Sequence, residues 1–351
     1  MSGGKRISSV GEFALIRSIS NILASSRVKS SGTLLGTGDD TALWQPRPGR
    51  AVAITTDTLV EGVHYRTDWS TAEQIGHRAL AVNVSDLAAM GARPRVAVVA
   101  LGLRGDEMDR WVYDMYRGML ALAGKLHVRI VGGDIVRSPR AQTISVTAIG
   151  EVRPGQEMRR DAAQIGDMIG VTGPLGLAAG GVRLLEQNGG LSDGAPAMKR
   201  AHLEPRPQVL AGMLLARAGV RCAMDISDGL LGDLPKICEA SGVSALLQQD
   251  DLPIPNSLRW NFPDWFDLAL RGGEDFELLF TAPPEVFAKA ADLFRRFGLR
   301  QPTVIGETIA PTPHGPRISM RFVDLHRDVL EPGAADHFPV APKIPAAAGI
   351  R

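Results

Sequence analysis

Apolar positions along the chain alternate between helical and strand periods, and each change of period marks a predicted element. Residues 12–23 place Phe13, Ile16, Ile19 and Leu23 on one side of a helix. Shorter apolar runs, bounded by Gly, Pro or polar residues, are typical of strands. We predict strands at 51–55, 96–103, 128–131 (ending at Gly132-Gly133), 143–151, 168–172, 277–281 and 304–307, with one more running into Asp225, and helices at 71–90, 108–126, 207–218, 232–241 and 285–297.

This alternation predicts an α/β protein of the α+β type, built as two domains. The length of 351 residues is comfortable for two cores. Arg153-Pro154-Gly155 is a plausible boundary, so we expect an N-terminal domain over residues 1–153 and a C-terminal domain over residues 154–338. Residues 339–351 are rich in Pro and Ala, and we expect them to form a disordered tail.

Charge and composition exclude several classes of protein. The 39 basic and 38 acidic side chains nearly cancel and form no basic stripe, so we expect no nucleic-acid partner. No apolar run approaches the roughly 18 residues that cross a bilayer, and the N-terminus lacks the apolar segment of a secretory signal. The two cysteines, Cys222 and Cys238, form no C-x-x-C motif, which favours buried thiols in a reducing compartment. We therefore expect a cytoplasmic enzyme.

Aspartates recur directly after the predicted strands. Asp57, Asp134 and Asp225 each follow such a run, and Asp228 comes three residues later. Carboxylates at strand ends point into the crevice where α/β domains bind ligands. Taken singly, a cap or a turn is the commoner role for an aspartate, and we assign Asp233, which opens a helix, to that role. Further aspartates lie in the apolar helix 71–90 (Asp86) and after a Gly-rich loop (Asp39, Asp40). Oxygen ligands that converge in this way suit Mg²⁺ or Mn²⁺.

Groups that could hold phosphate accompany these aspartates. The loop 173–176 lies between a strand and a helix, where backbone amides can bind an anion, although such loops are also common turns. Glycine pairs precede Asp134 and Glu274 and allow a ligand to approach the backbone. Arg159 and Arg160 are either phosphate ligands or solvated surface residues. The P-loop, the protein-kinase H-R-D set, H-E-x-x-H and G-x-S-x-G are all missing. A less common nucleotide-using fold is therefore indicated.

Taken together, these segments resemble the thiamine-monophosphate kinase family, in its order and with similar spacing, from about Gly11 to Phe338. The carrying stretches are GDDTAL (38–43), TTDTLVEGVH (55–64), AVNVSDLAAMG (81–91), GGD (132–134), RDAAQIGD (160–167), VTG (171–173), DISDG (225–229) and GGEDFE (272–277). The resemblance implies a two-domain fold like that of aminoimidazole ribonucleotide synthetase. It also implies a homodimer formed through the N-terminal sheet, with ATP in the cleft between the domains.

The resemblance assigns roles residue by residue, and it implies metal-assisted chemistry with no covalent nucleophile. Several Mg²⁺ ions would be held by eight side chains: Asp40, Thr55, Thr56, Asp57, Asp86, Asp134, Asp225 and Asp228. ATP would be contacted by Tyr116, Gly133, Asp134, Arg160 and Ser227. Thiamine monophosphate would be contacted by His64 and Glu274; packing in a loop is the alternative for His64.

The sequence departs from the family near its C-terminus. Ala335 stands where the family carries an aromatic residue that helps to hold thiamine, and Phe338 or Phe322 could replace it. The loss of one cation–π contact would cost about 1 kcal/mol.

The expected reaction is direct in-line transfer of the γ-phosphoryl group of ATP to thiamine monophosphate, giving thiamine diphosphate and ADP. The enzyme would thus be a phosphotransferase with a phosphate group as acceptor. One alternative is another ATP-dependent member of the superfamily with a different acceptor. The other is a non-catalytic protein that binds nucleotide or metal.

Overall fold

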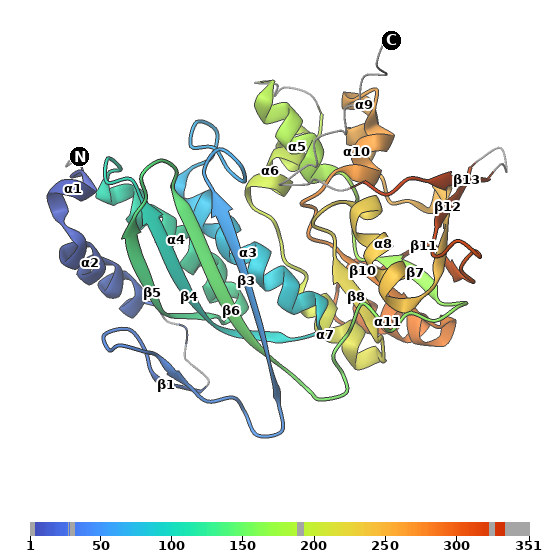
Figure 1. The fold of residues 1–351 in the computed structure, drawn as a ribbon, viewed down its shortest axis with the longest axis horizontal. Helices are drawn as coiled ribbons and strands as arrows, with labels where there is room; N and C mark the ends of the chain where they lie inside the picture. Colours follow the sequence, from blue (N-terminus) through green and yellow to red (C-terminus); the bar gives the residue numbers. More distant parts are fainter. Residues whose placement is uncertain (1–3, 27, 29–31, 188–192, 323–326, 334–351) are drawn as a thin grey trace, which may run out of the picture.

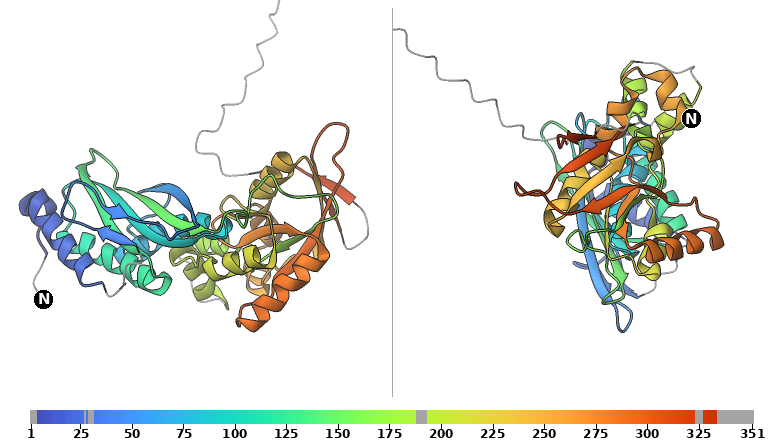
Figure 2. Two further views of the ribbon diagram at one scale, coloured as in Figure 1. Left: turned by 90° about the horizontal axis from the view of Figure 1, so that it is seen from below. Right: turned by 90° about the vertical axis from the view of Figure 1, so that its right-hand side faces the viewer.

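The computed structural model describes residues 4–26, 28, 32–187, 193–322 and 327–333, and they form two domains side by side (Figures 1 and 2). Each domain is built on its own β-sheet, with helices packed against it. In the described part of the chain, no helix is long and apolar enough to span a membrane. The predicted tail at 339–351 lies outside the described residues, as do Ala335 and Phe338.

The N-terminal domain has a four-stranded sheet in the order β3-β6-β4-β5. β3 (Ala51–Val60) and β4 (Arg93–Leu103) both pair antiparallel with β6 (Thr143–Val152), and β5 (Arg129–Arg137) pairs parallel with β4. Helices α3 (Ala72–Ala89) and α4 (Asp109–Leu126) cover one face of the sheet (Figure 1). The domain also contains α1 (Ile7–Val10), α2 (Glu12–Ala24) and a small hairpin of β1 (Thr33–Leu35) and β2 (Leu43–Trp44).

The opposite side of this sheet, which we call the open face, carries no helix in the described part of the chain (Figure 1). Side chains alternate along β3, so that Thr55 and Asp57 point toward α3 while Ile54 and Thr56 point to the open face. Ile54 is 67% exposed there. The two faces of one strand therefore carry different chemistry.

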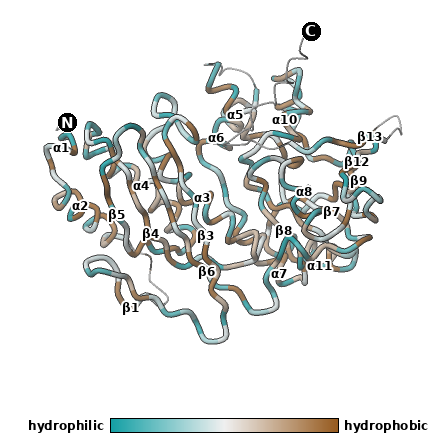
Figure 3. Tube along the Cα trace, in the orientation of Figure 1, coloured by the Kyte–Doolittle hydropathy of each residue, from teal (hydrophilic) through white to brown (hydrophobic). Residues whose placement is uncertain are grey.

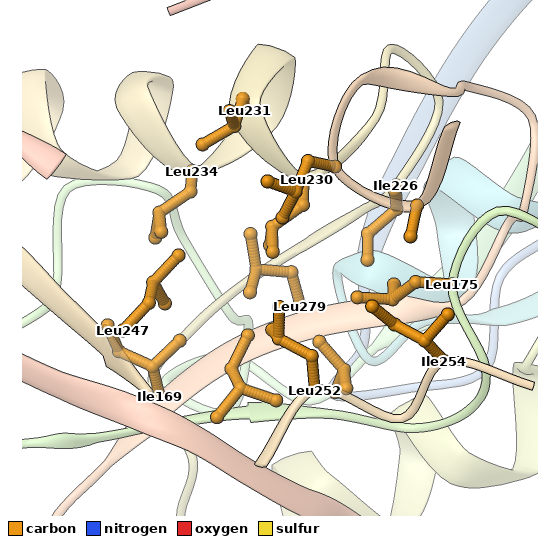
Figure 4. Close-up of a cluster of buried hydrophobic side chains, with 14 of the residues drawn as sticks. Ile169, Leu175, Ile226, Leu230, Leu231, Leu234, Leu247, Leu252, Ile254 and Leu279 are labelled. Atoms are coloured by element: carbon orange, nitrogen blue, oxygen red, sulfur yellow. The ribbon is translucent and has the colours of Figure 1, made fainter. Parts of the chain in front are cut away.

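The C-terminal domain has a seven-stranded sheet in the order β13-β12-β9-β11-β7-β10-β8. Buried Leu and Ile side chains from this sheet and from the helices on it form its core (Figure 4). Hydrophobic stretches follow the strands of both domains (Figure 3). The strands are β7 (Met168–Val171), β8 (Cys222–Asp225), β9 (Ser244–Gln248), β10 (Leu278–Ala282), β11 (Thr303–Ile309), β12 (Ile318–Arg321) and β13 (Arg327–Leu330). The helices are α5 (Leu177–Glu186), α6 (Ala195–Leu203), α7 (Val209–Ala218), α8 (Leu230–Ser241), the 3-10 turn η1 (Gln249–Asp251), α9 (Asn256–Asn261), α10 (Trp265–Arg271) and α11 (Pro284–Arg296).

Three predictions of local structure were wrong. The strands expected to stop before Asp57 and at Gly132-Gly133 both continue, so Asp57 lies inside β3 and Asp134 inside β5. The hydrogen bonds to neighbouring strands extend both elements through their polar residues. The buried face of α2 also differs from the prediction, since Phe13 is 80% exposed and Leu15 is fully buried.

Candidate active site

Helix α3 carries residues that organise the junction between the domains. It begins at a capping box in which Thr71 and Gln74 each satisfy the other's backbone N–H. It is buried almost all round because it packs on β3, α4 and the C-terminal domain. Its fully buried Asn83 accepts a hydrogen bond from the backbone N–H of Asp57 at 2.9 Å and donates to the Ala79 carbonyl oxygen at 3.0 Å. Asn83, to which sequence analysis assigned no role, thus fixes the strand that bears Asp57.

Asp57, Asp86 and Asp225 form the acidic wall of a cavity beside α3. Thr55 donates a hydrogen bond to Asp86. Burial and the neighbouring Asp86 charge raise the pKa of Asp57 to about 6. Burial, followed by the charge of Asp86, raises the pKa of Asp225 to about 7, and burial raises that of Asp86. A bound cation would stabilise the ionised forms of these three carboxylates.

The first cavity, as we call it, has a volume of about 650 Å³ and lies between the two domains. Most of its polar lining comes from the TTDTLVEGVH, DISDG and GGEDFE segments, so it gathers many of the predicted site residues. The predicted site residues that line the first cavity are Asp57, His64, Asp86, Asp225, Ser227, Asp228 and Glu274.

The loop after β8 is held from behind by Asp233, which lies in the first turn of α8. One Asp233 oxygen accepts hydrogen bonds from the backbone N–H groups of Ser227 and Asp228, both at 2.9 Å. Lys236 donates to Asp228 at 2.6 Å and to Asp233 at 2.8 Å. Asp233, which we expected only to open a helix, therefore positions the loop that carries Ser227 and Asp228.

His64 and Glu274 also line the first cavity. The ring Nδ1 of His64 accepts from the backbone N–H of Val60 at 3.0 Å, which holds the turn after β3. Burial alone would raise the pKa of Glu274, but Arg78 and His202 outweigh it and lower that pKa to about 2. Glu274 is therefore an ionised acceptor on the wall of the cavity.

The backbone N–H groups that we expected to bind an anion at loop 173–176 bind a carboxylate of this chain instead. Asp275 accepts from the backbone N–H groups of Gly176 at 2.6 Å and Ala178 at 3.1 Å, at the start of α5. The helix N-terminus thus binds an internal carboxylate, which fixes the GGEDFE loop against α5.

Several other predicted residues lie away from the first cavity. Asp40, Tyr116, Gly133 and Asp134 line a second cavity of about 540 Å³, which includes Ser145 and Thr147 of the open face. Thr56 also points to the open face, where it accepts a hydrogen bond from Thr147 at 3.1 Å. The predicted ligand set is therefore divided between the two sides of the sheet.

The structure gives a physical reason for Gly133 and separates the two predicted arginines, Arg159 and Arg160. A Cβ on Gly133 would lie 2.0 Å from the Val99 carbonyl oxygen, so the close approach of β4 already requires glycine at this position. Arg160 is exposed, and its charge acts to lower the pKa of Asp86. Arg159 instead forms a surface ion pair with Asp161.

The acidic wall fits a divalent cation by its donor chemistry. Among the described residues, no Lys or Arg forms an ion pair with Asp57, Asp86 or Asp225, and oxygen donors of this kind are those that Mg²⁺ prefers. Within the same part of the chain, no three His, Cys, Asp or Glu side chains already stand as a metal-binding group. The donors are therefore gathered in one cavity, but they are not arranged as a finished coordination shell.

Comparison with known proteins identifies the class to which this fold and site belong. The family described as "AIR synthase related protein, N-terminal domain" matches residues 38–152, and the corresponding C-terminal domain family matches residues 164–317. The two matches together span most of the chain and define an AIR synthase-related protein.

Within that class, the chain belongs to the thiamine-monophosphate kinase family. It is 37% identical to the thiamine-monophosphate kinase of Bacillus subtilis over 277 residues, which cover 78% of this chain and 84% of the relative. The crystal structure of the enzyme from Stenotrophomonas maltophilia is 40% identical with a TM-score of 0.77, covering 88% of this chain and 96% of that one. A structure described as AaThiL complexed with AMPPCP and TMP is 31% identical with a TM-score of 0.73, covering 96% and 100%. The family and the two-domain AIR synthase-like fold predicted from the sequence are confirmed.

Proposed function

We propose that this protein transfers the γ-phosphoryl group of ATP to thiamine monophosphate in a magnesium-dependent reaction, forming thiamine diphosphate and ADP. The observation that carries the proposal is the acidic wall of Asp57, Asp86 and Asp225, which faces an interdomain cavity and forms no ion pair with a Lys or Arg of the part of the chain that the structure describes. Such a wall would repel two phosphorylated reactants unless divalent cations screened it. The relationship to the thiamine-monophosphate kinases supplies the acceptor.

Roles for individual residues follow from their positions. Thr55, Asp57, Asp86, Asp225 and Asp228 would hold Mg²⁺ in the first cavity, where the bound metal would neutralise charge between donor and acceptor. Asn83 binds the backbone N–H of Asp57 and Asp233 binds that of Asp228, so two of these groups are positioned through their backbone. Ser227 and Arg160 would contact the nucleotide phosphates, and His64 with Glu274 would contact thiamine monophosphate. The acceptor phosphate is already ionised at neutral pH, so no general base is required.

We further propose that the protein is a homodimer that packs through the open face. Ile54 and Val136 are exposed on this face, and the second cavity includes its residues Ser145 and Thr147. A second copy covering the face would therefore border the cavity that contains Asp40, Tyr116, Gly133 and Asp134. Together with Thr56, the aspartates of this cavity would complete the metal and ATP contacts. Two free buried cysteines accord with a cytoplasmic location.

The deciding experiment incubates the purified protein with ATP, Mg²⁺ and thiamine monophosphate and separates thiamine species and nucleotides by chromatography. We expect thiamine diphosphate and ADP in equal amounts, and neither product when EDTA replaces Mg²⁺. ADP formed only with a different phosphorylated acceptor would indicate another superfamily activity. ATP binding with no ADP from any acceptor would indicate a non-catalytic protein.

A further inference from the structure

Three side chains from three elements meet beside the first cavity, which the acidic cluster also lines. Arg78 comes from α3 of the N-terminal domain, His202 from α6, and Glu274 from the loop before β10. The side chain of Arg78 is only 3% exposed, whereas that of Glu274 is 31% exposed and lines the cavity. Arg78 also borders the cavity, but the carboxylate is the most exposed member of the group.

The hydrogen bonds give each member a defined role. Arg78 donates to one Glu274 oxygen, and it also donates to the His202 carbonyl oxygen at 2.6 Å. The Nδ1 of His202 lies 2.9 Å from the other Glu274 oxygen. The same Nδ1 lies 3.1 Å from Arg78 Nη1, and a proton on Nδ1 makes its contact with the carboxylate, which only accepts, a hydrogen bond. Each oxygen of Glu274 has one partner here and keeps capacity for a donor on a ligand.

The backbone at Glu274 adds an independent observation. Glu274 has φ of 71° and Phe276 has φ of 49°, the left-handed region that non-glycine residues rarely occupy. Hydrogen bonds from Glu274 N–H to Ser227 O at 2.8 Å and from Phe276 N–H to Ile226 O at 2.9 Å hold this conformation. Glycine would adopt it more easily, yet this position bears a carboxylate that is bound on both oxygens. Strain maintained in this way is typical of a functional position.

We propose that Arg78 and His202 are positioning residues that hold Glu274 as an ionised carboxylate facing the positively charged ring of the substrate. This inference rests on the proposed function and deepens it, because it names the feature that the pocket selects: a phosphate ester that also carries a cation. It further makes substrate binding depend on the domain arrangement, since Arg78 belongs to one domain and Glu274 to the other.

The test compares Arg78→Met, Arg78→Lys and the surface control Arg296→Met, whose side chain is 70% exposed on α11. For Arg78→Met we expect KM for thiamine monophosphate to rise at least about tenfold, as for the loss of a charge-assisted hydrogen bond. KM for ATP and kcat at saturation should stay within about threefold, because the acidic wall is untouched. Arg78→Lys should recover most of the loss, and the control should behave as wild type.

A second acceptor isolates the selection of the cation. A phosphate monoester of similar size without a positive charge should have a high KM in the wild type. That KM should change little in Arg78→Met, so the variant loses discrimination. If KM rises equally for both acceptors, or only kcat falls, Arg78 has a general structural role and the inference is wrong.

Folding of the variants is checked by thermal unfolding. If Arg78→Met does not fold, His202→Leu removes the other side-chain contact to Glu274 and should raise KM for thiamine monophosphate in the same selective way; wild-type values in His202→Leu would overturn the inference. Failure of the proposed function would appear separately, because the wild type itself would then form no thiamine diphosphate.

Discussion

Asp57 and Asp86 approach the first cavity from two elements. The hydrogen bond that holds each residue in place does not require a negatively charged side chain. The Asp57 backbone N–H binds Asn83, and an Asn at position 86 could still accept from Thr55. We therefore expect Asp57→Asn and Asp86→Asn to fold normally and each to lower kcat at least about a hundredfold, as for removal of a group that stabilises transferring charge. Asp68→Asn, at a surface carboxylate paired with Arg66, is the matched control. Near-wild-type turnover in both site variants would contradict the metal assignment.

Glu277 provides a pH prediction that does not involve the metal site. Burial raises the pKa of Glu277 to about 7, against a smaller opposing effect of its hydrogen bond from Thr172. The folded state therefore holds a proton that the unfolded state has lost between about pH 4.5 and 7, so stability falls as pH rises through this window. Glu277→Gln should remove that fall and be more stable by about 3 kcal/mol at pH 8. Thermal unfolding at pH 4 and pH 8 measures it, and an equal pH dependence in both proteins would refute the assignment.

The residue types of the site could be predicted from the sequence, but their grouping could not. Asp57, Asp86 and Asp225 do face one cavity, whereas Thr56 and Asp134 lie on the other side of the sheet. The motif TTDT does not show which of its side chains share a face of the sheet. Neighbouring side chains point to opposite faces only if the strand continues through the motif, and the sequence predicted that the strand ends there. Asn83, Asp233 and Arg78 were missed because their roles are hydrogen bonds to residues distant in sequence or to loop backbone.

At the scale of elements, the crossing of α3 and α4 depends on two glycines. A Cβ on Gly76 would lie 1.8 Å from the Met115 carbonyl oxygen, and one on Gly118 would lie 1.9 Å from that of Glu73. Both contacts are with backbone, so the helices would have to separate and Asp86 would move with α3. Gly118→Ala should cost about 2–3 kcal/mol and lower the unfolding temperature.

Gly124 on the same helix is the control for this prediction. A Cβ there would meet no atom within 4 Å, so Gly124→Ala should stabilise the protein by about 0.5–1 kcal/mol through helix propensity. Equal effects of the two substitutions would mean that helix propensity, and not the close crossing, determines stability at both positions.

Long periodic elements were the most predictable part of the fold. The helices at α3, α4 and α11 and the strand β6 begin and end within two residues of the expected positions. Short elements such as β9, β12 and α9 were missed, because a few residues define no period and their structure comes from pairing with partners distant in sequence. The domain boundary at residues 153/154 stays a prediction.

At the scale of the whole molecule, the open face accounts for residues that the first cavity leaves out. The proposed dimer would bury Ile54 and place a second copy beside the cavity that contains Asp40 and Asp134. A two-fold interface repeats any substitution, so Ile54→Lys introduces two like charges into it. The substitution should weaken the dimer at least about a hundredfold and lower activity at dilute protein concentration.

Sedimentation over a concentration series measures this effect against Trp260→Lys, an apolar residue of α9 with nearly the same exposure, 69% against 67% for Ile54. The control should remain a dimer, since α9 belongs to the C-terminal domain, away from the open face. A wild-type protein that sediments at the 37.5 kDa of one chain would contradict the dimer. If that monomer were nevertheless fully active, Asp40 and Asp134 would have to reach the first cavity within a single chain, by movement of the segments that carry them around the edge of the sheet.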